Sequence, residues 1–138
     1  MNVYKPPSSR WEQNTLTDVT HPAVCVGDFN SRHTDWGYSS CNPDSEYLAR
    51  WAALGDLALV YDAKQGGSFH SARWAIPTNP DLCFMTRDVN NLPLPTSQLY
   101  LRRFPRSQHR PIVTTIGLTI PVVKSTPVSR WNLKKADW

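Results

Sequence analysis

The sequence predicts an α/β domain that is mostly β-structure, with one clear helix near residues 43–54. Short apolar runs bounded by glycine or proline recur along the chain, and each has the length of a strand. The 12 prolines mark nearly every expected boundary and exclude long helices from most of the chain. One segment alone has a helical apolar period with start and stop signals. At 138 residues the chain can form one domain with a substantial core, and it is too short for two.

The first forty residues predict two strands and two loops. These elements are a short strand at 1–5, a loop or short surface helix at 8–20, a buried strand at 23–27, and a long loop at 31–41. Two prolines end the first strand, and Gly27 allows a sharp turn at the end of the second. The segment 31–41 has turn residues throughout, so we expect it to lie over the end of the second strand.

The helix has the clearest local signals in the chain. Asn42 is a favourable N-cap, Pro43 suits the first helical position, and two acidic residues follow at the positive end of the helix dipole. Gly55 provides a stop. The spacing predicts an apolar face made of Tyr47, Leu48, Trp51 and Leu54.

The rest of the chain predicts further β-structure. Strands are expected at 57–61, 81–85, 97–104 and 112–120, with a short strand or turn at 67–70, a loop at 73–80 and a turn at 92–96. Leu99 and Leu101 should share one face of their strand. We place the domain at 1–121 and a linker or tail at 122–138.

Composition limits the classes of function. The net charge of +4 and the pI near 9.2 fit an anionic partner, although such a charge is common in ordinary proteins. Three cysteines without a CxxC spacing favour buried thiols over a disulfide or a zinc site. No run approaches the length of a membrane span, and no signal-peptide core follows Met1. We therefore expect an intracellular protein with no membrane partner.

The segment around which the chain is organised is the strand that leads into Gly27-Asp28-Phe29-Asn30. Asp28 and Asn30 are two residues apart, so both side chains can point to one side at the end of the strand. Ligands of α/β sheets commonly bind at that end. The simple alternative is an Asx-turn that closes the strand.

Three other polar residues adjoin apolar runs and can gather at the same edge: Tyr4, Asp81 and His109. Phosphodiester hydrolysis needs a positioned water, a base, a cation and donors to the phosphate oxygens. Asp28 can orient or deprotonate water, while Asn30 and Tyr4 can donate to phosphate. His109 can stabilise the transition state, with Asp81 holding its ring. Taken singly, each residue fits a simpler role better: Asp81 a turn cap, His109 a surface histidine and Tyr4 a packed side chain.

The order of the motifs resembles a known family. NVYxPP, GDFNxxHxxWG, TxPDLxF and SxHxPI follow one another as in the endonuclease/exonuclease/phosphatase superfamily. More narrowly, the chain is similar to the target-nicking endonuclease domain of jockey-type non-LTR retrotransposons. The resemblance implies a two-sheet α/β sandwich, with residues 1–121 as its C-terminal portion. It also implies that the tail 122–138 leads toward a reverse transcriptase.

This resemblance implies Mg²⁺-dependent cleavage of DNA, in the nucleus if the protein is functional. The matched catalytic positions are Tyr4, Asp28, Asn30, Asp81 and His109. Around the last motif lie four arginines expected to contact phosphates, or to be solvated loop residues: Arg102, Arg103, Arg106 and Arg110.

Two departures from the family pattern lead us to expect an impaired enzyme. The chain starts at about the tyrosine motif, so we expect the half with the main metal-binding glutamate to be absent; Glu12 and Glu46 do not match that position. Gln108 stands where the family has an aspartate, leaving Asp28 as a weak metal ligand. Loss of a charged partner in such a site costs a few kcal/mol, or roughly two to three decades in rate. We also expect an exposed apolar face.

Three functional hypotheses remain open from sequence. The first is an impaired remnant of a retrotransposon endonuclease. The second is a module that binds DNA or partners a reverse transcriptase without cleaving. The third keeps the superfamily but changes the substrate to a phospholipid or inositol phosphate, and the basic tail disfavours it.

Overall fold

The computed structural model describes residues 1–12, 15–73 and 75–117. A four-stranded sheet has the order β1-β2-β4-β3, and a two-stranded sheet pairs β5 with β6. The strands are β1 (Asn2–Tyr4), β2 (Val24–Asp28), β3 (Leu57–Val60), β4 (Asp81–Thr86), β5 (Thr96–Tyr100) and β6 (Ile112–Ile116). The helices are α1 (Pro43–Leu54) and two 3-10 turns, η1 (Thr34–Trp36) and η2 (Ala63–Gln65). β1 is parallel to β2, and the other pairs are antiparallel.

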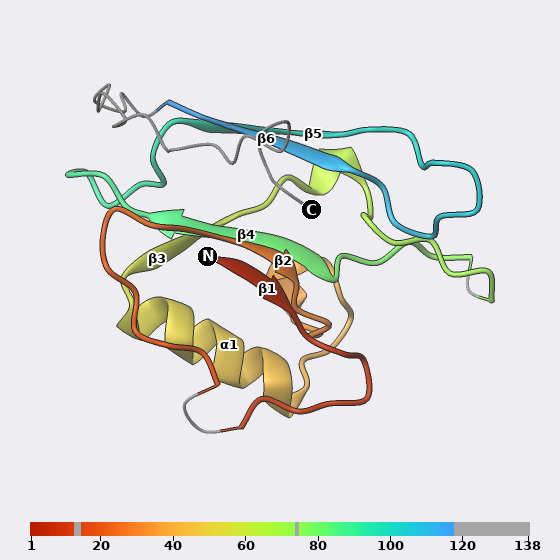
Figure 1. Ribbon diagram of the computed structural model, residues 1–138, viewed down its shortest axis with the longest axis horizontal. Coiled ribbons are helices and arrows are strands. Elements are labelled where there is room, and N and C mark those ends of the chain that lie inside the picture. Colours follow the sequence, from red (N-terminus) through yellow and green to blue (C-terminus); the bar gives the residue numbers. More distant parts are fainter. Residues whose placement is uncertain (13–14, 74, 118–138) are drawn as a thin grey trace, which may run out of the picture.

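The elements form layers (Figure 1): α1 covers one face of the four-stranded sheet, and the β5–β6 pair lies over the other. The predicted fold class, a two-sheet α/β arrangement that is mostly β with one clear helix, is confirmed. Within the described residues, no helix is both long and apolar enough to cross a membrane.

The main core lies between the four-stranded sheet and α1. Alternation along β4 directs Phe84 into this layer, where its ring packs edge-on against Phe29 at 5.5 Å and against Trp36 at 6.5 Å. Leu48 of α1 closes the cluster, and all four side chains are buried. On the other face of β4, the Met85 sulfur accepts a hydrogen bond from the Thr96 hydroxyl and so joins the two sheets.

The bounds of α1 match the prediction, because Asn42 and Ser45 form a reciprocal capping box at its start. The predicted apolar face is partly wrong. Leu54 is 83% exposed, while Ser45, Leu48 and Ala52 are the buried positions of α1. Leu54 lies six residues after Leu48 and so about 120° from it around the helix, and the two side chains do not point the same way.

The β5–β6 pair is shorter than predicted. β5 ends at Tyr100, and the described part of the last strand ends at Ile116. Leu99 and Leu101 do share a face, but it is the outer one, where they are 56% and 39% exposed. Val113 lies opposite Leu99 and is also exposed. The end of the predicted strand at 118–120 and the predicted tail at 122–138 lie outside the described residues.

The three cysteines are free thiols, with Cys25 and Cys83 buried and Cys41 exposed. Burial raises the pKa of the Cys83 thiol to about 11. The two buried thiols therefore act as small apolar side chains of the strands.

Candidate functional site

Strand register brings three of the predicted residues together. Asp28 is the last residue of β2 and lies directly opposite Asp81, the first residue of β4. Tyr4, the last residue of β1, pairs with Asp28 on the other side. These three side chains therefore share one face at one end of the sheet.

Gly27 makes this arrangement possible. A Cβ at this position would lie 1.8 Å from the carbonyl oxygen of Val3, and the residue has a φ of +152°. Only glycine lets β1 approach β2 this closely, beside the residue that carries the acid.

His109 lies between the two carboxylates. Its Nδ1 is 2.9 Å from Oδ2 of Asp81, and its Nε2 is 3.9 Å from Oδ2 of Asp28. The ring also meets the edge of Phe69, with centroids 4.8 Å apart. Asp81 therefore orients the imidazole, and Nε2 is the nitrogen turned toward Asp28.

Ser68 holds Asp81 and Asn79 holds Ser68, and sequence reasoning missed both. The Ser68 hydroxyl donates to Asp81 Oδ2 at 2.7 Å, and its N–H donates to Asn79 Oδ1 at 3.2 Å. The Asn79 amide in turn donates to the carbonyl oxygen of Trp36 at 3.1 Å. Both residues are buried. Their only sequence signal is adjacency to predicted site segments, which does not separate them from other polar loop residues.

Asn30 is positioned by its backbone. It has a φ of +42°, a left-handed conformation that asparagine tolerates. Its N–H donates to Asp28 Oδ1 at 3.1 Å, and its side-chain amide donates to the carbonyl oxygen of Lys5 at 2.8 Å. The first contact is an Asx-turn, so the simple alternative is present and is itself what aims the Asp28 carboxylate.

These residues line a cavity of about 830 Å³, within the range of ligand sites. Its walls include Tyr4, Asp28, Asn30, Arg32, Tyr38, Ser39, Ser40, Phe69, Gln108 and His109. Four of the ten come from the segment 31–41, which was predicted to lie over the end of the second strand. The ring of His33, in the same segment, stacks on the buried ring of Trp36, with centroids 4.7 Å apart.

The electrostatics favour a proton acceptor at Asp28. Burial raises the pKa of its carboxyl, and the nearby charge of Asp81 adds to the rise, whereas hydrogen bonds from Asn30 and the proximity of His109 oppose it. A carboxylate held in this way binds a proton more readily than one in water.

The donor set fits a Mg²⁺ ion only in part. Asp28, Asp81 and His109 offer ligand atoms within 4.8 Å of one another. However, Asp81 Oδ2 already accepts from Ser68 and His109, so Asp28 is the available carboxylate among the cavity-lining residues. Mg²⁺ is often held by one or two carboxylates, with waters and substrate phosphates completing the shell. Asp28 suits that role, and Gln108 adds a neutral amide in place of an acid.

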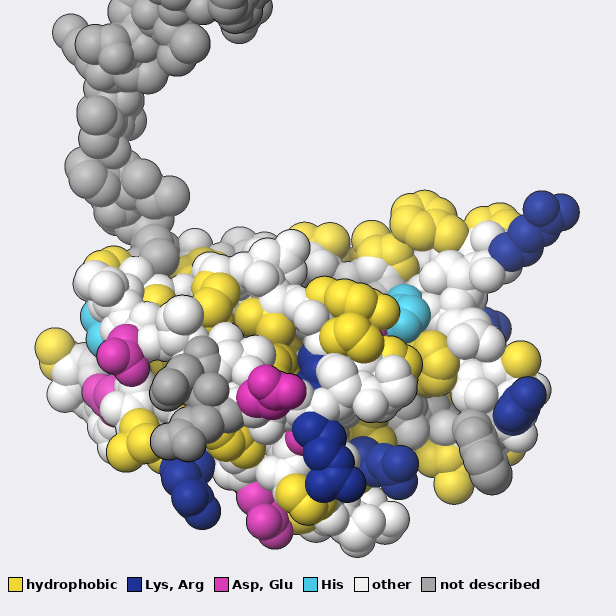
Figure 2. Space-filling view, turned by 60° about the horizontal axis from the view of Figure 1, so that its bottom comes forward, with side chains coloured by type: hydrophobic (Ala, Val, Ile, Leu, Met, Phe, Trp, Pro, Cys, Tyr) yellow, Lys and Arg dark blue, Asp and Glu magenta, His cyan; other side chains and the backbone are white. Residues whose placement is uncertain are grey.

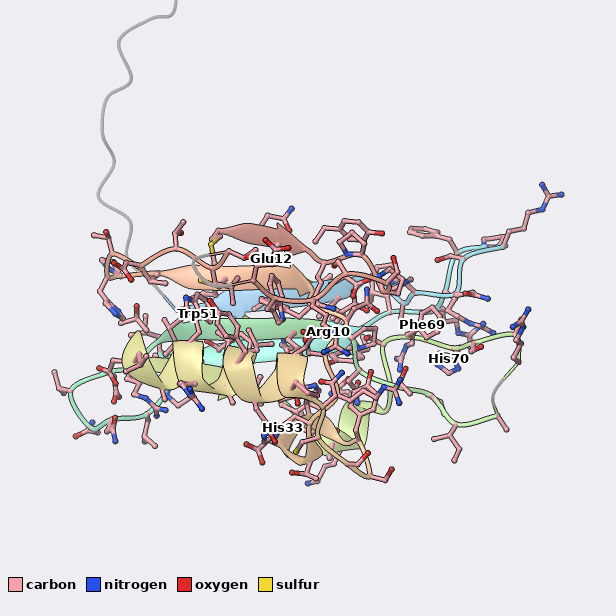
Figure 3. The ribbon with its side chains drawn as sticks, turned by 90° about the horizontal axis from the view of Figure 1, so that it is seen from below. Arg10, Glu12, His33, Trp51, Phe69 and His70 are labelled. Atoms are coloured by element: carbon pink, nitrogen blue, oxygen red, sulfur yellow. The ribbon has the colours of Figure 1, made fainter. Side chains whose placement is uncertain are left out.

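Two acids that the sequence excluded lie elsewhere. Neither Glu12 nor Glu46 lines the cavity. Figure 3 shows Glu12 well separated from Phe69 and His70, which lie together at the site end of the molecule.

The four arginines divide into two groups. The Arg110 guanidinium donates to the carbonyl oxygens of Leu101, Gln65, Gly67 and Tyr100 at 2.6 to 3.3 Å, so its donors are used within the fold. Arg102, Arg103 and Arg106 are exposed and are in no ion pair among the described residues. The sequence expectation of phosphate contact therefore suits these three and does not suit Arg110.

The fold and the site define a class: a two-sheet α/β arrangement with two carboxylates and a histidine at one end of the four-stranded sheet. Residues 1–113 match the family model described as endonuclease-reverse transcriptase. The chain belongs to that family.

A comparison with solved structures supports the fold. The structure is similar to the endonuclease domain of TRAS1, a telomere-specific non-LTR retrotransposon, with a TM-score of 0.56 and 19% sequence identity. The match covers 70% of this chain and 44% of that chain, so this chain spans less than half of the domain it resembles. The comparison with curated proteins finds no match. The predicted resemblance to a retrotransposon endonuclease is confirmed.

Proposed function

We propose that this site hydrolyses DNA phosphodiesters with Mg²⁺, at a rate reduced by the residue at position 108. The observation that carries the proposal is the His109 ring, held by Asp81 at 2.9 Å and turned toward Asp28 at the wall of the cavity. A base, an oriented imidazole and phosphate donors are what the reaction needs.

Each residue has a distinct role in this proposal. Asp28, with its raised pKa, orients the attacking water and accepts its proton. His109 places its Nε2 beside the developing charge on the phosphate, and Asp81 keeps that nitrogen aimed. Tyr4 and Asn30 donate to the phosphate oxygens. A bound Mg²⁺ would be held by Asp28 and would neutralise charge on the phosphate.

Position 108 is the expected cause of a reduced rate. Glutamine supplies no charge to attract a cation. Asp28 is the one carboxylate among the residues that line the cavity, so a single acid is left to hold the cation. We expect Gln108→Asp to raise the rate of nicking by roughly ten- to a hundredfold, because it restores a charged partner of the cation and the histidine.

The test is relaxation of supercoiled plasmid by the full chain, with Mg²⁺ or with a chelator. Slow nicking should require Mg²⁺, disappear with Asp28→Ala and increase with Gln108→Asp. Arg50→Gln, an exposed position on α1, is the matched control and should change nothing. Nicking that survives Asp28→Ala, or that Gln108→Asp fails to increase, would contradict the proposal.

A second candidate function is DNA binding without cleavage, alone or beside a reverse transcriptase reached through residues 122–138. The observation that favours it is the group of three exposed arginines next to the site. Salt-dependent binding to duplex DNA by a chain that never nicks, even as Gln108→Asp, would select this function. With either function, we expect the chain to act on DNA in the nucleus.

A further inference from the structure

A second cavity of about 830 Å³ lies beside the site and is built mainly from one loop, residues 101–108. Its lining comprises His70, Ala72, Arg102, Arg103, Phe104, Pro105, Arg106, Ser107, Gln108 and Arg110. No carboxylate is among these residues. Phe104 is 68% exposed, so its ring is presented to the cavity and not to the core.

The base of this loop is held firmly. The N–H of Leu101 donates to the carbonyl oxygen of Pro111, and the Arg110 guanidinium ties the carbonyl oxygens of Tyr100 and Leu101. The backbone N–H of Arg110 also donates to the carbonyl oxygen of Ser68 at 2.7 Å, which connects the loop to the residue that holds Asp81. A turn closes the tip, where Ser107 N–H donates to the carbonyl oxygen of Phe104. These hydrogen bonds fix the backbone of the loop that carries Phe104.

The charged side chains of the loop and of the cavity lining have one sign. The sequence has no Asp or Glu between Asp88 and Asp137. On the side of the molecule that carries α1, Figure 2 shows acidic and basic side chains mixed. At the far right of the same view, Lys and Arg side chains are seen without Asp or Glu. In Figure 1 the loop 101–111 lies at that end of the molecule. The ligand that complements this cavity is an anion.

An exposed aromatic ring among arginines indicates more than phosphate contact. Arginines follow a backbone of either single- or double-stranded nucleic acid. A ring stacks only on a base whose face is open, and such stacking is the usual means of holding single strands. In a duplex both faces of an internal base are covered, so Phe104 would add nothing there.

We propose that this cavity is a subsite for a single-stranded DNA segment beside the cleavage position, with an unpaired base stacked on Phe104 and its phosphates bound by Arg102, Arg103 and Arg106. The inference rests on the proposed DNA substrate. Gln108 lines both this cavity and the cavity of Asp28 and His109, so the two are contiguous. A strand at the site enters the subsite within a few nucleotides, and the site thereby favours ends, gaps or locally opened duplex.

The test measures binding of the full chain to fluorescent oligo-thymidine and to a duplex of equal length, by anisotropy and with metal chelated. Phe104→Ala should weaken oligo-thymidine binding about tenfold and change duplex binding by less than about twofold. Phe104→Trp should restore the single-strand affinity. Arg103→Gln should weaken both and reduce the salt slope by about one between about 50 and 200 mM salt. Arg50→Gln is the control and should affect neither.

Several results would overturn the subsite. These are no binding to oligo-thymidine, an equal loss for both DNAs on Phe104→Ala, or a preference of more than about tenfold for oligo-uridine over oligo-thymidine. Because the metal is chelated, the outcome is independent of nicking. If the chain nicks plasmid but does not bind oligo-thymidine through Phe104, the proposed function stands and the subsite is refuted. If it binds oligo-thymidine through Phe104 but does not nick plasmid, the subsite stands and the nuclease function is refuted.

Discussion

Lys5→Met should destabilise the domain far more than the loss of an ordinary surface lysine. Lys5 is 2% exposed, and its ammonium lies 3.1 Å from Asp44 and 2.7 Å from the carbonyl oxygen of Ser9. It also lies 5.9 Å from the ring centroid of Trp11. The substitution keeps most of the side-chain volume and removes the charge, so it isolates the electrostatic contribution.

The magnitude follows from what the substitution leaves behind. The Asp44 side chain is 15% exposed and would keep one protein donor, the N–H of Trp11 at 3.0 Å. Removing one partner of a buried ion pair typically costs about 3–5 kcal/mol. The partial exposure of Asp44 and its position near the positive end of α1 offset part of this cost, so we expect about 3 kcal/mol, or roughly 10 °C in Tm.

Urea unfolding of the wild type, Lys5→Met, Asp44→Leu and the double variant forms a double-mutant cycle. The coupling should be about 2 kcal/mol, and the double variant should be more stable than Lys5→Met alone, because no uncompensated charge remains buried. Arg10→Met, an exposed cation on the same connection, is the control and should cost less than about 0.5 kcal/mol. A cost for Lys5→Met below about 1 kcal/mol would refute the assignment of Asp44 as a desolvated partner.

Three further predictions concern the site. Asp81→Asn should lower any Mg²⁺-dependent nicking by about 10²- to 10⁴-fold at unchanged circular dichroism, because His109 loses its charged orienting partner. Asp28→Asn should raise Tm near pH 7 but leave it close to wild type near pH 3. The pKa of the Asp28 carboxyl is raised in the fold, so the folded wild type binds the carboxyl proton more tightly than the unfolded chain does. The wild type therefore loses stability as the pH rises from the pKa of the unfolded chain to the raised pKa of the fold. A difference in Tm between variant and wild type that stays the same from about pH 3 to about pH 7 would contradict the prediction. Gly27→Ala should cost at least about 3 kcal/mol, measured in urea, because its Cβ would overlap the Val3 carbonyl.

The elements with local signals were predictable from sequence. α1 begins and ends where its cap, proline and glycine indicate, because those signals act within one helical turn. The buried face of α1 was less predictable, because the apolar residues Tyr47, Leu48, Trp51 and Leu54 surround much of the helix, and packing against the sheet decides which of them are buried. Leu48 is buried in the structure and Leu54 is exposed.

The site divides in the same way. The motifs predicted that Asp28, Asp81 and His109 lie near one another, because Asp28 ends β2, Asp81 begins β4 and His109 precedes β6 by three residues. Ser68 and Asn79 carry no comparable signal, since their roles arise from contacts between segments that only the folded chain defines. The role of Arg110 was likewise not predictable, because the sequence does not distinguish an arginine that binds phosphate from one that binds backbone carbonyl oxygens.

The pairing of Asp28 with Asp81 has a consequence for engineering. The chain travels through α1, β3 and two long loops between these residues, yet one rung of the β2–β4 ladder fixes their spacing. Residues added between Ser71 and Arg73 would leave that rung unchanged. A single insertion inside β4 would turn Asp81 to the opposite face of the sheet and separate it from His109. Variant libraries with altered loops can therefore change which substrates reach the site, whereas the number of residues in β2 and β4 must stay the same.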